Sequence, residues 1–200
     1  MTELVNIGVS RGASRLRRIV GSEVLLSVPA IELVDRRTAA TILQQRETGQ
    51  FVAVRQSFEG ALCGHASLIF PESNSLELVR AVAGGNFPDN EIAEIEDDAL
   101  SETGNIVLNA CLGTIANMLQ RPLAMALPQI TRRPGGMLFE PSDDSSQEDG
   151  VLFLYVNFMI SDRNIRGYIT MLMDLPSLKT LKSLIDGFLD SVSGSDEAVK

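Results

Sequence analysis

The stretch Ser101–Leu119, SETGNIVLNACLGTIANML, has the composition of a buried helix, yet it carries an acid and an amide three positions apart, Glu102 and Asn105. The first ten residues of the chain, MTELVNIGVS, contain the same pair as Glu3 and Asn6. A pair that recurs at the same spacing suggests that the chain is built from two related halves. An internal repeat constrains the whole fold, so we consider it before the local secondary-structure patterns.

The two pairs belong to a longer internal repeat. Pro29 and Pro128 lie at the same offset of 99 positions as the two Glu–Asn pairs, and each half continues with two apolar stretches, a polar turn and a further helical pattern. We predict one domain at 1–190, made of repeats at about 1–86 and 89–190, with a flexible tail at 191–200.

Hydrophobic periodicity and turn residues place the elements of each half. In the first half we predict a helix at Thr2–Val20, strands at Glu23–Ala30, Phe51–Phe58 and Ala61–Phe70, and a helix at Ser75–Val82. In the second half we predict a helix at Asp89–Gln120, strands at Pro122–Ile130, Val151–Ser161 and Ile165–Leu172, a mobile loop at Thr131–Gly150, and a helix at Ser177–Leu189. Hairpins imply antiparallel pairing. The predicted fold is α+β, a pseudo-twofold duplicated unit whose mainly antiparallel sheet carries two long helices.

Composition excludes several classes of function. The net charge of -9, from 17 basic and 26 acidic residues, argues against nucleic acids and anionic membranes as partners. No apolar run has the ~18 residues of a membrane span, and no signal peptide is evident, so we expect a cytoplasmic protein. Cys63 and Cys111 are expected to be buried reduced thiols. His65 is expected to be structural or exposed, because no Cys or acid lies near it at metal-ligand spacing, and no metal site is predicted.

The helix around Glu102 has a narrow polar stripe. Asp98, Glu102, Asn105 and Asn109 fall within roughly 60° of one another on a helix that turns about 100° per residue, while the rest of the circumference is mostly apolar. Such a stripe can simply be the face that a buried helix shows to water. Asparagine is, however, a poor helix former, and a merely solvated position would favour Glu, Lys or Gln. The recurrence in both halves favours a functional interpretation.

The spacing Asp98-x3-Glu102-x2-Asn105-x22-Pro128 resembles the signature of the CheC/CheX/FliY family of chemotaxis phosphatases, and two copies in one chain are most similar to CheC. This resemblance implies hydrolysis of the aspartyl phosphate of a CheY-like receiver domain. It implies that the receiver supplies the Mg2+, so that the chain needs no cofactor of its own. It also allows a second partner, the receptor deamidase CheD. We expect a monomer, because two repeats can satisfy internally a contact that a one-site relative makes by dimerising.

Under this resemblance, Asn105 is the residue that positions the attacking water. A neutral amide can donate and accept hydrogen bonds without adding negative charge beside a phosphoryl group, and phosphoryl transfer depends mainly on positioning and charge stabilisation. Glu102 would anchor the receiver through an ion pair. Asp98 and Asn109 would add to the same contact surface, and Pro128 would shape a turn at a strand end beside it.

The first half repeats the signature incompletely, because no counterpart of Asp98 precedes Glu3 in the chain. Glu3 and Asn6 are therefore a second but weaker predicted site, with Pro29 in the place of Pro128. Two other interpretations remain open at this point. One is a non-catalytic adaptor that binds CheD or a receiver domain, and the other is a purely structural part of a flagellar switch.

Overall fold

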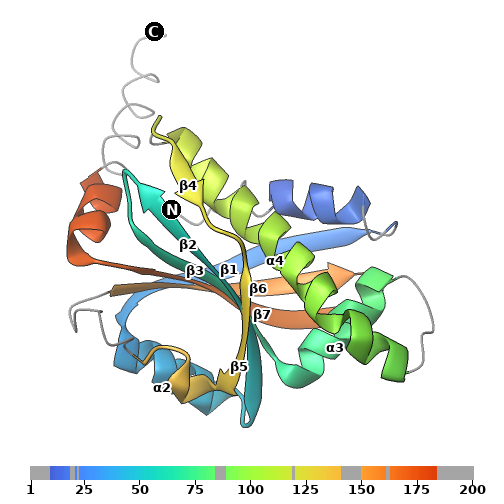
Figure 1. The fold of residues 1–200 in the computed structure, drawn as a ribbon. Helices are drawn as coiled ribbons and strands as arrows, with labels where there is room; N and C mark the ends of the chain where they lie inside the picture. Colours follow the sequence, from blue (N-terminus) through green and yellow to red (C-terminus); the bar gives the residue numbers. More distant parts are fainter. Residues whose placement is uncertain are drawn as a thin grey trace, which may run out of the picture.

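The computed structural model describes residues 10–18, 21, 23–83, 89–118, 120–140, 150–160 and 163–183 (Figure 1). Its strands are β1 (Val24–Asp35), β2 (Gln50–Gly60), β3 (Gly64–Pro71), β4 (Leu123–Met125), β5 (Gln129–Pro134), β6 (Gly150–Ile160) and β7 (Arg163–Met173). Its helices are α2 (Arg36–Arg46), α3 (Glu72–Ala83) and α4 (Asp89–Met118), with a 3-10 turn η1 (Gly135–Met137). Residues 10–18 and 175–183 are also helical.

One sheet joins the seven described strands in the order β1-β6-β7-β3-β2-β4, and β5 also pairs with β2. Every pairing is antiparallel. The order is symmetric between the halves, because the first strand of each half pairs with the middle strand of the other, and the hairpins β2–β3 and β6–β7 meet where β3 pairs with β7. The predicted α+β class, with its pseudo-twofold and mainly antiparallel sheet, is confirmed.

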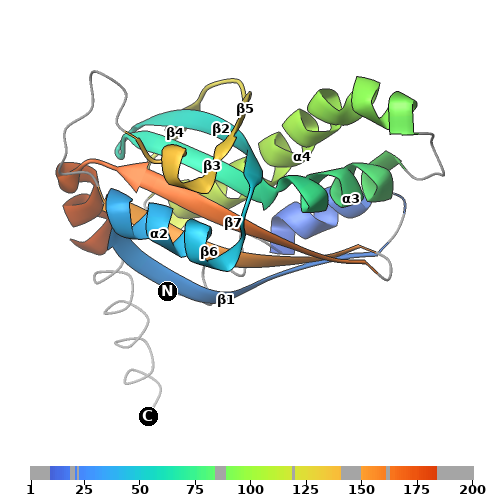
Figure 2. The ribbon, with the colours of Figure 1, turned by 90° about the horizontal axis from the view of Figure 1, so that it is seen from below.

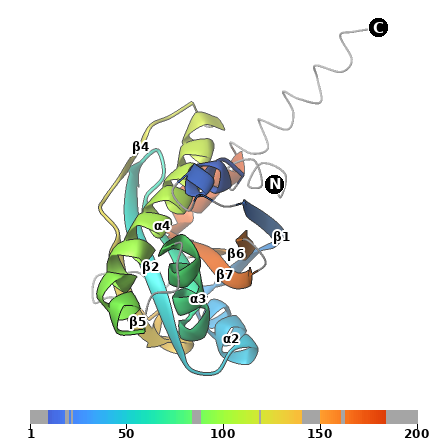
Figure 3. The ribbon, with the colours of Figure 1, turned by 90° about the vertical axis from the view of Figure 1, so that its right-hand side faces the viewer.

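Helices cover both faces of this sheet. Side chains along a strand alternate between the two faces, so one strand can contribute to the core on each side. Val52 and Val54 of β2 belong to the main core, which includes α3, α4 and the helix at 10–18. Phe51 and Ala53 point the other way, into a second core with α2. Figures 1 and 3 show α4 lying across the sheet with the helix at 10–18 beside it, and Figure 2 shows α2 on the opposite face.

The helix α2 was missed in the sequence, where we predicted only a variable connection. Asp35 caps it, since its Oδ1 accepts a hydrogen bond from the backbone N of Thr38 at 2.7 Å. Only Ala39 and Leu43 are buried, so the hydrophobic periodicity that would reveal the helix is weak. Its last turn is fixed by Arg46, whose guanidinium carbon lies 4.2 Å from the centre of the Tyr155 ring.

Pro29 was expected at a strand end, and this is wrong. It lies inside β1, where the pairing with β6 shifts register between Ser27 and Ala30. The strand is at the edge of the sheet and the register shift is a bulge, the two settings in which a strand tolerates the missing N–H of proline. The first strand therefore runs to Asp35 and does not stop at Ala30.

The segment after α4 also differs from the prediction. The single strand expected at Pro122–Ile130 is two short strands, β4 and β5, separated by residues 126–128. Part of the loop expected at Thr131–Gly150 is β5 itself, which pairs with Gln50–Arg55 of β2, and η1 follows it. The hydrogen bonds that this segment forms with the free edge of β2 make it a strand, although its Pro and Gly residues are typical of a loop. Residues 141–149 lie outside the described part.

Several ends of helices can be compared only in part. The helix expected at Thr2–Val20 is described only at 10–18, so Glu3 and Asn6 lie outside the described residues. The helix expected at Asp89–Gln120 is present as α4, and the last helix is described at 175–183. The tail at 191–200 also lies outside. No described helix is long and apolar enough to cross a membrane.

The two cysteines differ in their surroundings, and the expectation that both are buried is wrong for one of them. Cys63 is exposed in the turn between β2 and β3. Cys111 is buried in α4, where burial raises the pKa of its thiol to about 12. Neither forms a disulfide.

Candidate functional site

The polar stripe of α4 lies where that helix passes over β2. Asp98 and Glu102 are exposed, and Asn105 and Asn109 are half-buried. The opposite side of the helix is buried in the main core through residues such as Val107. The stripe thus changes along its length from free carboxylates to amides that are partly enclosed by the sheet.

The amide of Asn105 is held by a glutamine that we did not single out in the sequence. Gln56 of β2 is only 1% exposed, and its Nε2 donates to Asn105 Oδ1 at 3.1 Å. The same nitrogen donates to the backbone O of Ala126 at 3.0 Å. From α4 itself, Asn109 Nδ2 donates to Asn105 Oδ1 at 2.7 Å. Asn105 Oδ1 therefore accepts two hydrogen bonds, one from the sheet and one from the next turn of its own helix.

This network fixes which end of the Asn105 amide faces outward. A backbone carbonyl can only accept, so the group of Gln56 beside Ala126 must be the nitrogen. That nitrogen requires an oxygen from Asn105, which in turn requires the nitrogen of Asn109. What remains is Asn105 Nδ2, whose two N–H groups make no hydrogen bond with a described residue and are not buried. The site presents a fixed pair of donors.

The network also leaves two oxygens unsatisfied. Gln56 Oε1 and Asn109 Oδ1 are buried and have no hydrogen-bond partner among the described residues. A buried polar atom without a partner costs about 1–3 kcal/mol. We had expected Asn109 to contribute to a contact surface, whereas its amide is turned inward onto Asn105. The amide nitrogens of Gln56 and Asn109 are thus both directed to Asn105 Oδ1.

The connection between β4 and β5 forms the other wall of the site. Ala126 N donates to the backbone O of Ser57 at 3.0 Å, so this connection is bound to β2 by both its N–H and its C=O. Pro128 follows in the same connection and is half-buried. Between them, Leu127 is 86% exposed, the highest value among the exposed large apolar side chains of the described residues.

Close packing brings α4 near enough to β2 for these contacts. A Cβ added to Gly104 would lie 2.7 Å from Cβ of Val54, so no larger residue fits there without movement. Val54 is two residues before Gln56 on the same face of β2, and Gly104 immediately precedes Asn105. Because Gly104 has no side chain, α4 can lie close enough to β2 for Gln56 to form a hydrogen bond with Asn105.

Charges near the stripe fall into two groups. Arg132 of β5 pairs with Glu96 at 3.2 Å and Asp97 at 2.5 Å, and the hydrogen bond that it donates to Asp97 raises the pKa of Arg132. Asp98 and Glu102, by contrast, make no ion pair with a described residue. These two carboxylates, which have no partner among the described residues, remain available to a basic group of another molecule.

The structure brings only part of the predicted set together. Glu102, Asn105 and Pro128 lie around one site, but Pro29 lies in β1, at the far end of the sheet from β2. In the part of the chain that the structure describes, no group of three or more His, Cys, Asp or Glu side chains could hold a metal ion. Gln56 could have been found from the alternation of β2, where a polar residue occupies a core-facing position between Val54 and Phe58.

Comparison with known proteins finds similar chains among chemotaxis proteins. No family model matches the chain. The chain is 20% identical over 188 residues to the putative CheY-P phosphatase CheC1 of Halobacterium salinarum, covering 93% of each protein. It is 23% identical over 193 residues to the CheY-P phosphatase CheC of Bacillus subtilis, covering 90% of each. The chain is thus similar to CheC-type proteins over nearly its whole length.

Solved structures support the same fold. FliY of Thermotoga maritima matches with a TM-score of 0.72 at 15% identity, covering 94% of this chain and 93% of that one. CheX in the CheX–CheY–BeF3–Mg2+ complex of Borrelia burgdorferi matches with a TM-score of 0.55 at 16% identity, covering 87% and 100%. The FliM middle domain from Helicobacter pylori matches with a TM-score of 0.59 at 11% identity, covering 92% and 94%. These likenesses show the fold that such proteins share.

Proposed function

We propose that this protein is a phosphatase of the aspartyl phosphate of a CheY-like receiver domain. The observation that supports the proposal most directly is the Asn105 amide, whose oxygen is held by Gln56 and Asn109 and whose two N–H groups face outward. The relatives named CheY-P phosphatases and the CheX–CheY complex support the same substrate class.

In the proposed reaction, Asn105 Nδ2 donates a hydrogen bond to the oxygen of a water molecule. One lone pair of that water then remains for attack on phosphorus. The bond between phosphorus and the aspartyl oxygen breaks, and the products are inorganic phosphate and the free aspartate carboxylate. From the sequence we expected the amide both to donate a hydrogen bond to the water and to accept one from it. In the structure, however, Asn105 Oδ1 already accepts two hydrogen bonds, from Gln56 and Asn109, so only its nitrogen is left for the water. Orientation of this kind contributes several kcal/mol to catalysis.

The other stripe residues are assigned to docking. Glu102 lies one helical turn from Asn105, is exposed, and has no partner in the described chain, so it would pair with a basic group of the receiver. Asp98 lies one turn further along and extends the same acidic edge. The Mg2+ of the reaction would be the receiver's own, as the resemblance in sequence implies.

The test is the decay of a phosphorylated CheY-like receiver in Mg2+ with and without catalytic amounts of the protein. We expect faster release of inorganic phosphate, with several turnovers per protein molecule. A protein that binds the phosphorylated receiver and leaves its decay rate unchanged would instead be an adaptor, and the phosphatase proposal would be abandoned.

The first prediction concerns the residue that holds Asn105. Replacement Gln56→Leu removes both hydrogen bonds donated by Gln56 at nearly constant volume, so the Asn105 amide can rotate. We expect kcat for receiver dephosphorylation to fall about tenfold with little change in KM, because misorientation affects the reacting geometry more than docking. Steady-state phosphate release measures both constants. The matched control is Gln45→Leu on exposed α2, and unchanged kcat in Gln56→Leu would contradict the positioning role.

The second prediction concerns the exposed leucine beside the site. Leu127 belongs to the connection whose Ala126 carbonyl holds Gln56, so a receiver docked over Asn105 would cover it. Replacing it with aspartate should raise KM about tenfold and leave kcat unchanged, since burial of one leucine is worth about 1.5–3 kcal/mol. The control is Leu33→Asp, which changes a 63% exposed leucine at the opposite edge of the sheet. Equal KM values for the two variants would exclude Leu127 from the contact.

A further inference from the structure

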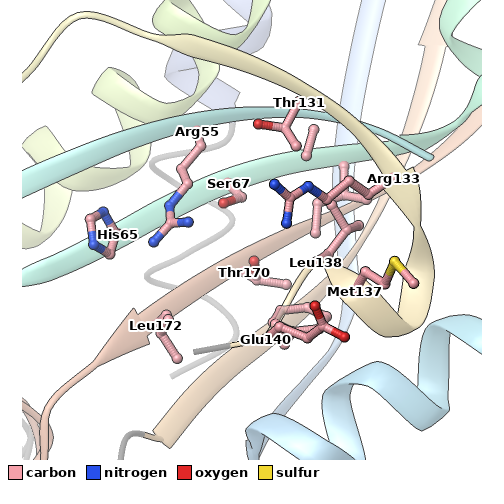
Figure 4. A pocket seen from close by; sticks show the side chains of 13 residues that line it. Arg55, His65, Ser67, Thr131, Arg133, Met137, Leu138, Glu140, Thr170 and Leu172 are labelled. Atoms are coloured by element: carbon pink, nitrogen blue, oxygen red, sulfur yellow. The ribbon is translucent and has the colours of Figure 1, made fainter. Parts of the chain in front are cut away.

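A second site lies on the face of the sheet that α4 does not cover. A pocket of about 270 Å³ opens there between β2, β3 and β7 on one side and β5 with η1 on the other (Figure 4). Arg55 and Arg133 both line it, and Figure 4 shows their guanidinium groups directed into the same space. The pocket is separate from Asn105, which lies on the opposite face of β2.

The polar residues of this pocket form a row across three strands. Arg55 of β2 pairs with Ser67 of β3, and Ser67 pairs with Thr170 of β7. Directly paired residues in neighbouring antiparallel strands are about 5 Å apart at their Cβ atoms. Thr131 of β5 adds a third hydroxyl to the lining. Two guanidinium groups and three hydroxyls thus surround one small volume, and each of them can donate hydrogen bonds.

The positive charge in this pocket is not neutralised within the described chain. Neither Arg55 nor Arg133 makes an ion pair with a described residue. Burial lowers the pKa of the half-buried Arg55, and the charges of Arg36 and Arg133 lower it further. Glu140 also lines the pocket but forms no ion pair with either arginine. In a chain with a net charge of -9, the half-buried Arg55 beside Arg133, neither of them paired with a described carboxylate, is a favourable place for an anion to bind.

We propose that this pocket binds a small ligand that bears a phosphate monoester, with its oxygens on Arg55 and Arg133 and on the hydroxyls of Ser67 and Thr170. Guanidinium groups match phosphate oxygens in geometry and charge, and a tetrahedral dianion can use donors from several directions at once, which a planar carboxylate cannot. Ile69 and Leu172 provide apolar wall beside these donors, and the volume exceeds what a phosphate ion fills. The organic part of the ligand would occupy that remainder.

The experiment is a titration of the native protein followed by amide NMR, at constant ionic strength set with sodium chloride. The probes are inorganic phosphate, as the free ion, and glycerol 2-phosphate, as a minimal monoester. We expect saturable shifts in residues of β2, β3 and β7 around the pocket, with glycerol 2-phosphate binding at least threefold more tightly. Equal affinities would restrict the site to the free ion and overturn its assignment to a monoester.

Three pocket variants and one control variant complete the test. Arg55→Gln and Arg133→Gln should each weaken glycerol 2-phosphate binding at least tenfold, because each removes a charge-assisted contact. Glu140→Gln should tighten it about twofold or more, since a negative charge at the wall is removed. Arg17→Gln, on the exposed surface of the helix at 10–18, is the matched control and should bind like the native protein.

Thermal unfolding with and without glycerol 2-phosphate separates a loss of ligand binding from a loss of stability in a variant. Glycerol 2-phosphate should raise the Tm of the native protein and of Arg17→Gln, because a ligand that binds only the folded state stabilises it. It should not raise the Tm of Arg55→Gln. Shifts that are matched by chloride alone, or that are equal in native protein and Arg55→Gln, would overturn the proposal without affecting the phosphatase assay.

Discussion

Replacing Asn105 with alanine is expected to lower kcat for receiver dephosphorylation about 100-fold while the phosphorylated receiver still binds. The change removes the Asn105 Nδ2 group, which is not buried and makes no hydrogen bond with a described residue. Loss of positioning at a reacting centre costs rate by factors of this order. Phosphate release and receiver binding, measured separately, distinguish a catalytic loss from a docking loss.

The sharper variant is Asn105→Asp, because it is nearly isosteric. One carboxylate oxygen can still accept from Gln56 Nε2 and Asn109 Nδ2, so the internal network is kept. The second oxygen replaces the exposed N–H groups with negative charge, which repels a phosphoryl group. We expect kcat to fall at least as far as in Asn105→Ala. Full activity in Asn105→Asp would show that the outward nitrogen is not the acting group.

Two further variants compare the contribution of Asn105 to activity with those of Asn109 and Asn6. Asn109→Ala removes one of the two bonds to Asn105 Oδ1 and leaves the bond from Gln56, so its effect should be smaller than that of Asn105→Ala. Asn6→Ala tests the first copy of the signature. We expect the larger loss from Asn105, and the opposite order would assign the main activity to the first half.

The repeat was sufficient to predict the fold class, because each half has to use the other to complete a sheet. The connection from 31 to 50 could not be read in the same way, since α2 buries only Ala39 and Leu43 and its start depends on the cap at Asp35. Pro29 was misplaced because a strand-end position is its usual setting, whereas an edge strand with a bulge accepts it internally. In both cases tertiary contacts decided a structure that local composition left open.

The predicted site was incomplete for a different reason. A helical wheel shows which residues of α4 share a side, but it contains no information about the strand that this side meets. Gln56 is 49 positions from Asn105 in sequence, and the register of α4 on β2 is set by packing, so their hydrogen bond could not be derived from spacing. A buried glutamine at a core-facing position of β2 was the available signal.

That register leads to the prediction with the largest effect on stability. Gly104→Ala should lower the free energy of unfolding by about 2 kcal/mol, because the new Cβ would lie 2.7 Å from Cβ of Val54 and must displace α4 from β2. Val54 cannot easily yield, since a β-branched side chain in a paired strand has few alternative rotamers. Denaturant unfolding measures the change. The displacement should also lengthen the bond from Gln56 to Asn105 and lower kcat.

The same helix offers a control with the opposite sign. A Cβ added to Gly113 meets nothing within 4 Å, so Gly113→Ala should raise the free energy of unfolding by about 0.5–1 kcal/mol through helix propensity alone. Adding Val54→Ala to Gly104→Ala should recover stability relative to the sum of the single changes, because the two side chains compete for one space. If Gly104→Ala and Gly113→Ala shift stability in the same direction, close approach at Gly104 does not set the position of α4, and the spacing of Gln56 and Asn105 must have another cause.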